Sequence, residues 1–442
     1  MIQQSEKLLT DLYNAFDPFY PLSAGALQYV DSQETRGDMN INIDLGRKIL
    51  RSQRMTCQLY AGHRGAGKST ELLRLQRYLN SQGFFTIYFA ADEQDINPEN
   101  TEYTDILLAC TRHLLESLIN ANSQPLRDWM KDRWEDLKGL GLTEVSFDKL
   151  SLELQITQFA KLTANVRNVP SLRQKIRDKI NPHILTLINA LNKFICDAKQ
   201  KLPNGYLQLV LIVDNLDRIV PFTQEGGRNN LDEIFLIHSE QLKSLDCHVI
   251  YTIPISIVYS NRANQLLNNY DNPQTLPMIM VQDQDGSVNE RGLATIKKLI
   301  EKRVEQVNPN LSLETGLFDS LETLEHLCLM SGGHIRNLLS MIQVAISRTE
   351  DLPITAKAVQ RATNQARDVY RRTTGEDEWE ILAKVYKTKR ILNDQQHRDL
   401  LFNRCIFEYR YYDEEEIISW YDVHPLIKGI KQFKDSLTQL EL

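Results

Sequence analysis

The sequence predicts an α/β protein with a doubly wound parallel sheet, followed by a helical unit and a small mixed unit. Between residues 55 and 290, apolar segments of strand length alternate with segments that have helical spacing. The segment Leu207–Val213 is almost continuously apolar, which is typical of a central parallel strand. The chain has 442 residues, which is enough for two to four domains.

The first half of the chain is expected to contain a lead-in and the core. Residues 1–54 predict a helix, a loop and a second helix near Ile43–Arg51. The core follows at residues 55–290, with a helical insertion at about 100–205 where glycines are few and the periodicity is helical. Five strands are expected, at Thr56–Tyr60, Phe84–Ala91, Leu207–Val213, His248–Ile255 and Met278–Val281.

The second half is expected to contain a helical lid and a small C-terminal domain. Residues 291–374 predict an α-helical lid, with helices at Leu293–Val307, Leu317–Met330, His334–Ser347 and Ala356–Tyr370. Residues 375–442 predict two helices and then two strands around a polar turn at 412–416, which is the order of a winged helix. These four elements are expected at Trp379–Thr388, Gln395–Asn403, Cys405–Tyr411 and Ile417–Val423.

The most informative motif is Gly-His-Arg-Gly-Ala-Gly-Lys-Ser at residues 62–69, which fits the phosphate-binding loop (P-loop) pattern G-x-x-x-x-G-K-[ST]. An apolar strand precedes it and a helix follows. Its glycines allow backbone N–H groups to curl around phosphates, and the helix N-terminus adds partial positive charge. Lys68 is expected to reach the β- and γ-phosphates of ATP, and Ser69 to bind Mg²⁺. The expected nucleotide-binding residues are Gly62, His63, Arg64, Gly65, Ala66, Gly67, Lys68, Ser69 and Thr70.

A second motif, Asp214-Asn215-Leu216-Asp217-Arg218, follows the third expected strand. A carboxylate at the tip of such a strand is where P-loop NTPases make a second Mg²⁺ contact, so Asp214 is the expected partner of Ser69. Asn215 cannot accept a proton but can orient water, and Asp217 could serve as base if the loop bends inward. ATP binding is therefore the stronger inference, and hydrolysis is the weaker one.

Composition limits the expected partners and location. The net charge is −7, from 51 basic and 58 acidic residues, so the chain has no global basic footprint for nucleic acid. No apolar run approaches membrane-spanning length and the N-terminus lacks a signal-peptide pattern, which predicts a cytoplasmic protein without a membrane partner. Six cysteines lie singly, which favours reduced thiols and argues against zinc.

The series formed by the P-loop, the Asp-Asn-Leu-Asp-Arg motif, a lid segment Gly-Gly-His-Ile-Arg and the winged-helix order resembles the AAA+ and STAND group of ATPases. The resemblance is closest to the branch that includes origin-recognition-complex-like proteins. It implies that Arg336 contacts the γ-phosphate from the lid and that Thr252 is a polar sensor at the end of the fourth strand. A solvated helix arginine and an ordinary β-branched strand residue are the alternatives for these two.

The same resemblance suggests further contacts. Arg218 or Arg262 could act as an arginine finger on a neighbouring subunit, although salt bridges on a helix surface explain both equally well. Tyr29 and Arg36 lie where such proteins contact the nucleobase.

The leading functional prediction is an ATP-dependent molecular switch that hydrolyses ATP slowly and controls self-association or a separate effector partner, in defence or signalling. One alternative is a DNA-binding loader or initiator that uses the winged helix; another is a non-hydrolysing scaffold stabilised by nucleotide. Residues 376–442 carry 10 basic and 14 acidic side chains, a net of −4, and the turn Asp413-Glu414-Glu415-Glu416 would repel phosphates. A local basic stripe exists at Lys384, Lys387, Lys389 and Arg390.

Overall fold

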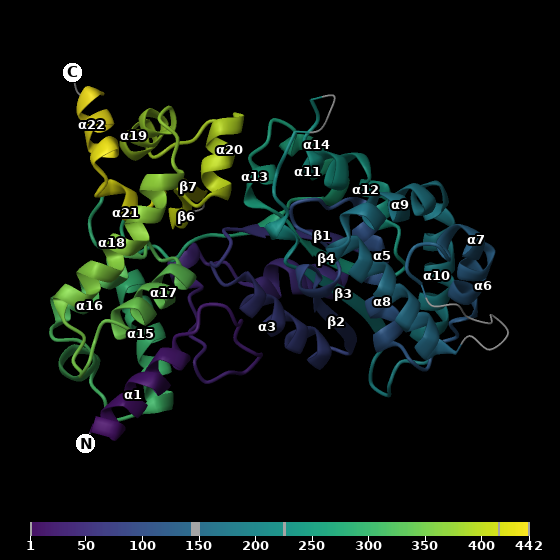
Figure 1. The fold of residues 1–442 in the computed structure, drawn as a ribbon, viewed down its shortest axis with the longest axis horizontal. Helices are drawn as coiled ribbons and strands as arrows, with labels where there is room; N and C mark the ends of the chain where they lie inside the picture. Colours follow the sequence, from purple (N-terminus) through teal and green to yellow (C-terminus); the bar gives the residue numbers. More distant parts are fainter. Residues whose placement is uncertain (1, 143–150, 224–226, 414–415, 441–442) are drawn as a thin grey trace.

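The computed structural model describes residues 2–142, 151–223, 227–413 and 416–440. Figure 1 shows two bodies side by side. One holds the sheet and the insertion helices, and the other holds the helical unit and the C-terminal elements. The N-terminal helix α1 (Ile2–Ala15) lies with the second body, against α15 and α17, so the segment after it crosses back to the sheet.

The core is a five-stranded parallel sheet with the order β2-β3-β4-β1-β5. The interior strand β3 buries alternate side chains in two different hydrophobic clusters, Leu209 and Leu211 in one and Val210 and Ile212 in the other. Both faces of the sheet are therefore covered, and the predicted doubly wound fold is confirmed. The strands are β1 (Cys57–Gly62), β2 (Phe84–Ala90), β3 (Gln208–Asp214), β4 (His248–Thr252) and β5 (Gln274–Leu276).

The prediction of a fifth strand at Met278–Val281 is wrong. The fifth strand is β5, which begins four residues earlier and pairs with the side of β1 opposite β4, with Thr275 opposite Ala61. Met278 and Met280 donate their backbone N–H groups to the carbonyls of Glu408 and Thr35 instead, at 2.9 and 3.0 Å. This apolar segment is extended because it is held by the C-terminal hairpin and the N-terminal segment, and not by the sheet.

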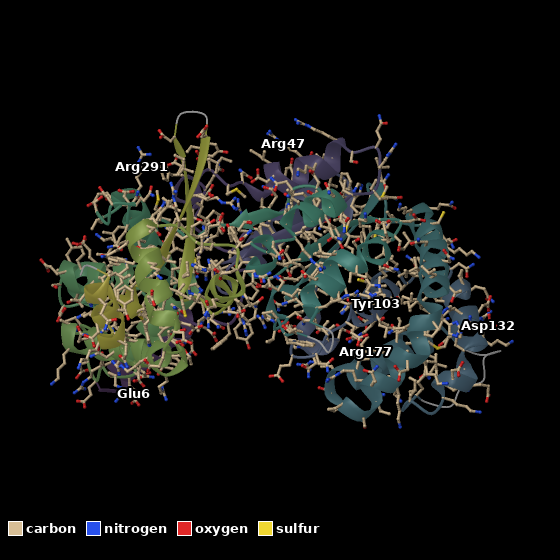
Figure 2. All side chains as sticks on the ribbon, turned by 90° about the horizontal axis from the view of Figure 1, so that it is seen from above. Glu6, Arg47, Tyr103, Asp132, Arg177 and Arg291 are labelled. Carbon is tan, nitrogen blue, oxygen red and sulfur yellow. The ribbon has the colours of Figure 1, made fainter. Side chains whose placement is uncertain are left out.

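The helical insertion covers one face of the sheet. Its buried Arg177, labelled in Figure 2 near Tyr103, forms ion pairs with Glu102 at 3.0 Å and with Asp105, and so ties α9 to the start of α5. The opposite face is covered by α3 (Lys68–Ser81). The insertion helices are α5 (Tyr103–Ser117), α6 (Gln124–Asp132), α7 (Trp134–Leu137), α8 (Leu152–Asn168), α9 (Pro170–Ile180) and α10 (Ile184–Gln200).

Shorter helices connect the elements of the core. A π-helical turn at Asn42–Gly46 precedes α2, where the sequence predicts one continuous helix. The short helices are α2 (Arg47–Arg51), α4 (Ala91–Gln94), α11 (Asn230–Asp232), α12 (Ser239–Lys243), α13 (Ile255–Val258) and α14 (Ala263–Tyr270).

The helical unit contains α15 (Glu290–Val307), α16 (Leu321–Met330), α17 (Ile335–Ile346) and α18 (Ala356–Thr373). The C-terminal unit begins with α19 (Glu378–Thr388) and α20 (Gln395–Phe402), which precede the antiparallel hairpin of β6 (Ile406–Asp413) and β7 (Glu416–Val423). The predicted order of two helices and two strands is thus present. Two helices that the sequence analysis omits follow it, α21 (Pro425–Lys428) and α22 (Lys431–Gln439), and α22 lies against α19.

Glu414 and Glu415, half of the acidic turn predicted from the sequence, lie outside the described residues. Within the described ranges, no helix combines the length and the apolar character needed to cross a membrane.

Candidate nucleotide site

The P-loop lies between β1, which ends at Gly62, and α3, which begins at Lys68. Gly62, Gly65 and Gly67 have φ angles of 145°, 93° and 111°, where side chains other than glycine are strained. A Cβ at Gly62 would also lie 2.9 Å from the carbonyl oxygen of Leu276 in β5. The glycines of the motif are therefore needed for the course of the loop.

Lys68 lies beneath this loop and is buried. Its Nζ donates to the carbonyl oxygens of Gly62 and His63 at 2.8 and 2.9 Å, and forms an ion pair with Asp217 Oδ2 at 2.8 Å. Only 4% of the Lys68 side chain and 6% of the Asp217 side chain are exposed. The loop is thus tied through one ammonium group to the segment that follows β3.

The two expected metal ligands lie together at the end of β3. Asp214 Oδ1 accepts the backbone N–H of Asn215 at 2.7 Å, Oδ2 accepts the Tyr88 hydroxyl at 2.7 Å, and the Ser69 side chain also hydrogen-bonds to this carboxylate. Burial, and next the charge of Asp217, raise the pKa of Asp214, while these hydrogen bonds oppose the rise. A hydroxyl and a carboxylate side by side are ligands that suit Mg²⁺, and phosphate oxygens would add to them.

Tyr88 is a candidate site residue that the sequence analysis missed. It lies in β2, adjacent to β3 in the sheet, and it lines the same cavity as the P-loop. Nothing in the apolar sequence of β2 distinguishes this tyrosine from a core residue, because its partner Asp214 lies 126 positions away.

The residues after Asp214 are engaged with other side chains. Asn215 adopts a left-handed conformation (φ 65°) and its Nδ2 donates to Asp92 Oδ1 at 2.7 Å. Arg218 Nη1 binds the other oxygen of Asp92 at 2.5 Å. Asp217 and Asn215 are thus engaged by Lys68 and Asp92. In this geometry neither side chain is free to position a water molecule.

The cavity above the P-loop measures roughly 1080 Å³ when its open mouth is counted. Basic side chains outnumber acidic ones in its wall: Arg36, Arg64, Lys68, Arg218, Arg303 and Arg336 line it, against Glu71, Glu93 and Asp217. Phe19 and Tyr20 also line the cavity and are 71% and 79% exposed. The sequence analysis did not single out these two aromatic residues.

Tyr29 and Arg36, expected near a nucleobase, also line this cavity but are held by other groups. Arg36 is buried and donates to the carbonyl oxygen of Ala66 at 2.8 Å, so it supports the P-loop from behind. The Tyr29 ring lies 4.1 Å from the guanidinium carbon of Arg74, and its hydroxyl donates to Glu71 at 3.2 Å.

Arg336 and His334 bring the lid to the P-loop. The backbone N–H of Arg336 donates to the carbonyl of Gly65 at 3.2 Å, and its side chain lines the cavity. Burial, then the charges of Arg218 and Arg64, lower the pKa of Arg336 to about 10. Because these guanidinium groups repel one another inside the cavity, a bound polyanion would stabilise their charged forms.

Thr252 and Arg262 lie elsewhere. The Thr252 hydroxyl accepts the N–H of Leu216 at 3.0 Å, is fully buried and is absent from the cavity wall. Arg262 lies 3.6 Å from Asp232 near α14. Arg218, by contrast, lines the cavity of its own chain.

The C-terminal hairpin also contacts the P-loop. His63 Nε2 accepts the backbone N–H of Glu408 in β6 at 3.1 Å, and Tyr409 donates its hydroxyl to the carbonyl of Gly332 in the lid at 2.8 Å. The Phe407 ring lies edge-on to His63 and parallel to His334, with centroids 5.3 and 5.6 Å apart. The P-loop, the lid and the hairpin therefore meet at one junction.

No family model and no curated protein sequence matches the chain. Among solved structures, Cdc6p from Pyrobaculum aerophilum is 12% identical over 97% of this chain and 98% of that chain, with a TM-score of 0.41. The ORC2 protein of Aeropyrum pernix, solved as ADPNP–ADP complexes, is 10% identical over 97% and 98%, with a TM-score of 0.42. The ORC1 protein of Aeropyrum pernix, in complex with DNA, is 12% identical over 91% and 94%, with a TM-score of 0.36.

Two of these are origin-recognition-complex proteins, the branch that the sequence motifs resemble. The strand order and the loop of this chain themselves define an α/β protein with the P-loop NTPase fold. At such low identity, the activity of the chain has to be argued from its own site.

Proposed function

We propose that the chain binds ATP·Mg²⁺ between the α/β core and the lid and works as a slowly hydrolysing molecular switch. The observation that carries the proposal is the convergence of Lys68, Ser69 and Asp214 at the P-loop, beneath a cavity lined by arginines. Backbone N–H groups and Lys68 would hold the phosphates, and Ser69 and Asp214 the metal. Arg336 would contact the γ-phosphate, and Phe19 and Tyr20 the base. Bound Mg²⁺ would neutralise phosphate charge.

Slow hydrolysis is supported by the ion pair that engages Asp217, the base expected from the sequence. Of the carboxylates that line the cavity, Asp217 binds Lys68 and Glu71 binds Arg74, whereas Glu93 has no ion pair with any described residue. Glu93 is exposed and lies in α4, the short helix that follows β2, so we propose it as the group that activates water. Asp217 would have to leave Lys68 before it could take that role.

The lid contacts support a switch, because they connect the P-loop to α17 and to the hairpin. If ATP binds the closed arrangement more tightly than an open one, it shifts the population toward the closed form. The controlled event would be self-association or the docking of a separate effector, in defence or signalling.

The structure gives less support to DNA binding through the C-terminal unit. Lys389 of the basic stripe is largely buried and forms an ion pair with Asp422 at 2.9 Å, and Lys384 forms one with Glu380. A phosphate contact by either lysine would first have to break its ion pair. A DNA loader therefore remains the second candidate, and salt-sensitive binding to duplex DNA would favour it.

The decisive experiment is native mass spectrometry of the wild type and of Lys68→Ala, each without nucleotide, with ADP and with a slowly hydrolysed ATP analogue. Binding of the analogue by the wild type and its loss in Lys68→Ala is the expected result. Assembly only with the analogue would support control of self-association, and a constant mass would point to a separate partner. A wild type that binds no nucleotide would overturn the proposal.

Hydrolysis is tested with Glu93→Gln. General-base catalysis contributes about 10²- to 10⁴-fold, so we expect kcat to fall by at least about 100-fold while nucleotide affinity changes little. An unchanged kcat would exclude Glu93 and return the role to Asp217.

A further inference from the structure

A second cavity lies on the other side of the P-loop. It is enclosed by α17 and α18 of the lid, by the turn between α20 and β6, and by α21, and it measures roughly 1650 Å³ when its open mouth is counted. The lid side of this cavity is mixed in character. Polar side chains of α17 and α18, among them Asn337, Ser340, Gln365 and Thr373, lie beside an apolar group formed by Met341, Val344, Ala362, Ala366 and Val369. The apolar group can pack against the body of an organic ligand.

The opposite wall carries positive charge. Arg404 and Arg64 line the cavity, and neither guanidinium has a hydrogen bond or ion pair with a described side chain. The two lining carboxylates are already engaged, Asp217 by Lys68 and Glu378 by the backbone N–H of Gly375 at 2.6 Å. The cavity thus combines this apolar group with two guanidinium groups that can bind an anion.

Arg404 occupies an unfavourable backbone position. It follows the end of α20 in the left-handed region, with φ 63°, where glycine or asparagine is favoured and other residues cost about 1 kcal/mol. Burial is the main cause that lowers the pKa values of the nearby His63, His334 and His424, and the charge of Arg404 adds to it. Neither carboxylate that lines the cavity, Asp217 or Glu378, forms an ion pair with Arg404.

We propose that this cavity is a second ligand site, which takes a small organic anion with an apolar body and one carboxylate or phosphate end. The body would pack on the α17–α18 wall, and the anionic end would bind Arg404 and Arg64.

The second site shares residues with the first. Gly62, Arg64 and Asp217 line it, and Arg64 and Asp217 also line the nucleotide cavity. An anion that holds Arg64 would change the charge facing the phosphates, so the two ligands would alter each other's affinity by the same factor. This coupling rests on the proposed nucleotide site, whereas binding of the anion does not.

The test uses the full chain and the probe 8-anilinonaphthalene-1-sulfonate, which has an aromatic body and one sulfonate. We expect a saturable rise in fluorescence that ATP·Mg²⁺ does not abolish. Ala366→Phe, which fills the cavity, and Arg404→Asn, which removes the charge in a residue that tolerates this backbone, should each raise the dissociation constant at least tenfold. Arg404→Lys should restore part of the affinity.

Matched controls separate the site from general effects. Ala356→Phe places the same ring at an exposed position of α18, and Arg390→Asn removes an exposed charge outside both cavities. Both should bind the probe within twofold of the wild type. Decanoate and decyl phosphate as competitors distinguish a carboxylate from a phosphate end. Wild-type probe affinity in folded Ala366→Phe would overturn the site, even if Arg404→Asn fails to fold.

The two proposals fail separately. If a fluorescent ADP does not bind but the probe depends on Ala366 and Arg404, the nucleotide function fails and the anion site stands. If the nucleotide binds while both variants leave the probe unchanged, the second site alone is wrong.

Discussion

Removal of only one partner of the Lys68–Asp217 ion pair should lower the stability of the fold. Lys68→Met leaves a carboxylate whose side chain is 6% exposed without its cation. Loss of one partner of a buried pair destabilises by about 3–5 kcal/mol, so we expect a drop of this size in the free energy of unfolding. Urea unfolding measures it. The double variant Lys68→Met/Asp217→Leu should recover most of the loss, and equal losses in both variants would contradict this account.

Tyr88 positions the carboxylate of Asp214, which we propose as a metal ligand. Tyr88→Phe keeps the ring and removes only the hydroxyl that donates to Oδ2 at 2.7 Å. Loss of such an orienting contact weakens metal binding about 10-fold or more, so the Mg²⁺ concentration that half-saturates ATP hydrolysis should rise by that factor. Nucleotide affinity in EDTA is the control and should be unchanged. A shift in both would assign Tyr88 to the fold instead.

His334 caps the N-terminus of α17 and also contacts the P-loop. His334 Nδ1 accepts the N–H of Asn337 at 3.0 Å, and Nε2 then donates to the carbonyl of Arg64 at 2.8 Å. His334→Asn keeps a capping side chain but loses the bond to the P-loop, whereas His334→Ala loses both. We expect nucleotide to dissociate faster from both variants. The free energy of unfolding of His334→Ala should be about 1 kcal/mol lower than that of His334→Asn. Dissociation at the wild-type rate in His334→Asn would show that the lid contact does not retain nucleotide.

At the scale of elements, the sequence predicts correctly those helices, strands and loops that depend on local sequence patterns. The P-loop, β3 with Asp214, and the four lid helices follow from glycine spacing, apolar runs and helical periodicity. β5 is misplaced because Met278 and Met280 look like a strand, yet their backbone partners are Glu408 and Thr35, far away in the chain. Local sequence patterns cannot predict hydrogen bonds between residues so far apart in the chain.

The candidate site also contains residues that local sequence patterns predict and residues that they do not. Lys68, Ser69 and Asp214 can be found from motifs, because their chemistry requires those residue types at those positions. Tyr88 and Glu93 cannot, because they become part of the site only when β2 is placed beside β3. The same holds for the engagement of Asp217 with Lys68, which requires the folded loop.

At the scale of the whole molecule, three buried histidines connect the core, the lid and the C-terminal unit. His63, His334 and His424 are at most 1% exposed. Burial is the main cause that lowers the pKa of His63 to about 3 and the pKa values of the other two well below 6.5, and the positive charge of Arg404 adds to it. Lys68 acts on His63, and Lys428 acts on His424. The folded junction therefore requires neutral imidazoles.

Stability should fall in acid because of this junction. Below pH 6.5 the unfolded chain binds protons at these histidines that the folded chain does not, so the free energy of unfolding decreases as pH falls. Each histidine contributes about 1.4 kcal/mol per pH unit until its folded pKa is reached. Urea unfolding at pH 7, 6 and 5 measures the slope. In His424→Gln, whose amide can accept the N–H of Leu426 without titrating, the slope between pH 6 and 5 should be smaller by about that amount. An unchanged slope would mean that His424 stays neutral in the unfolded chain or is protonated in the folded one, and burial of this histidine would then not contribute to the loss of stability in acid.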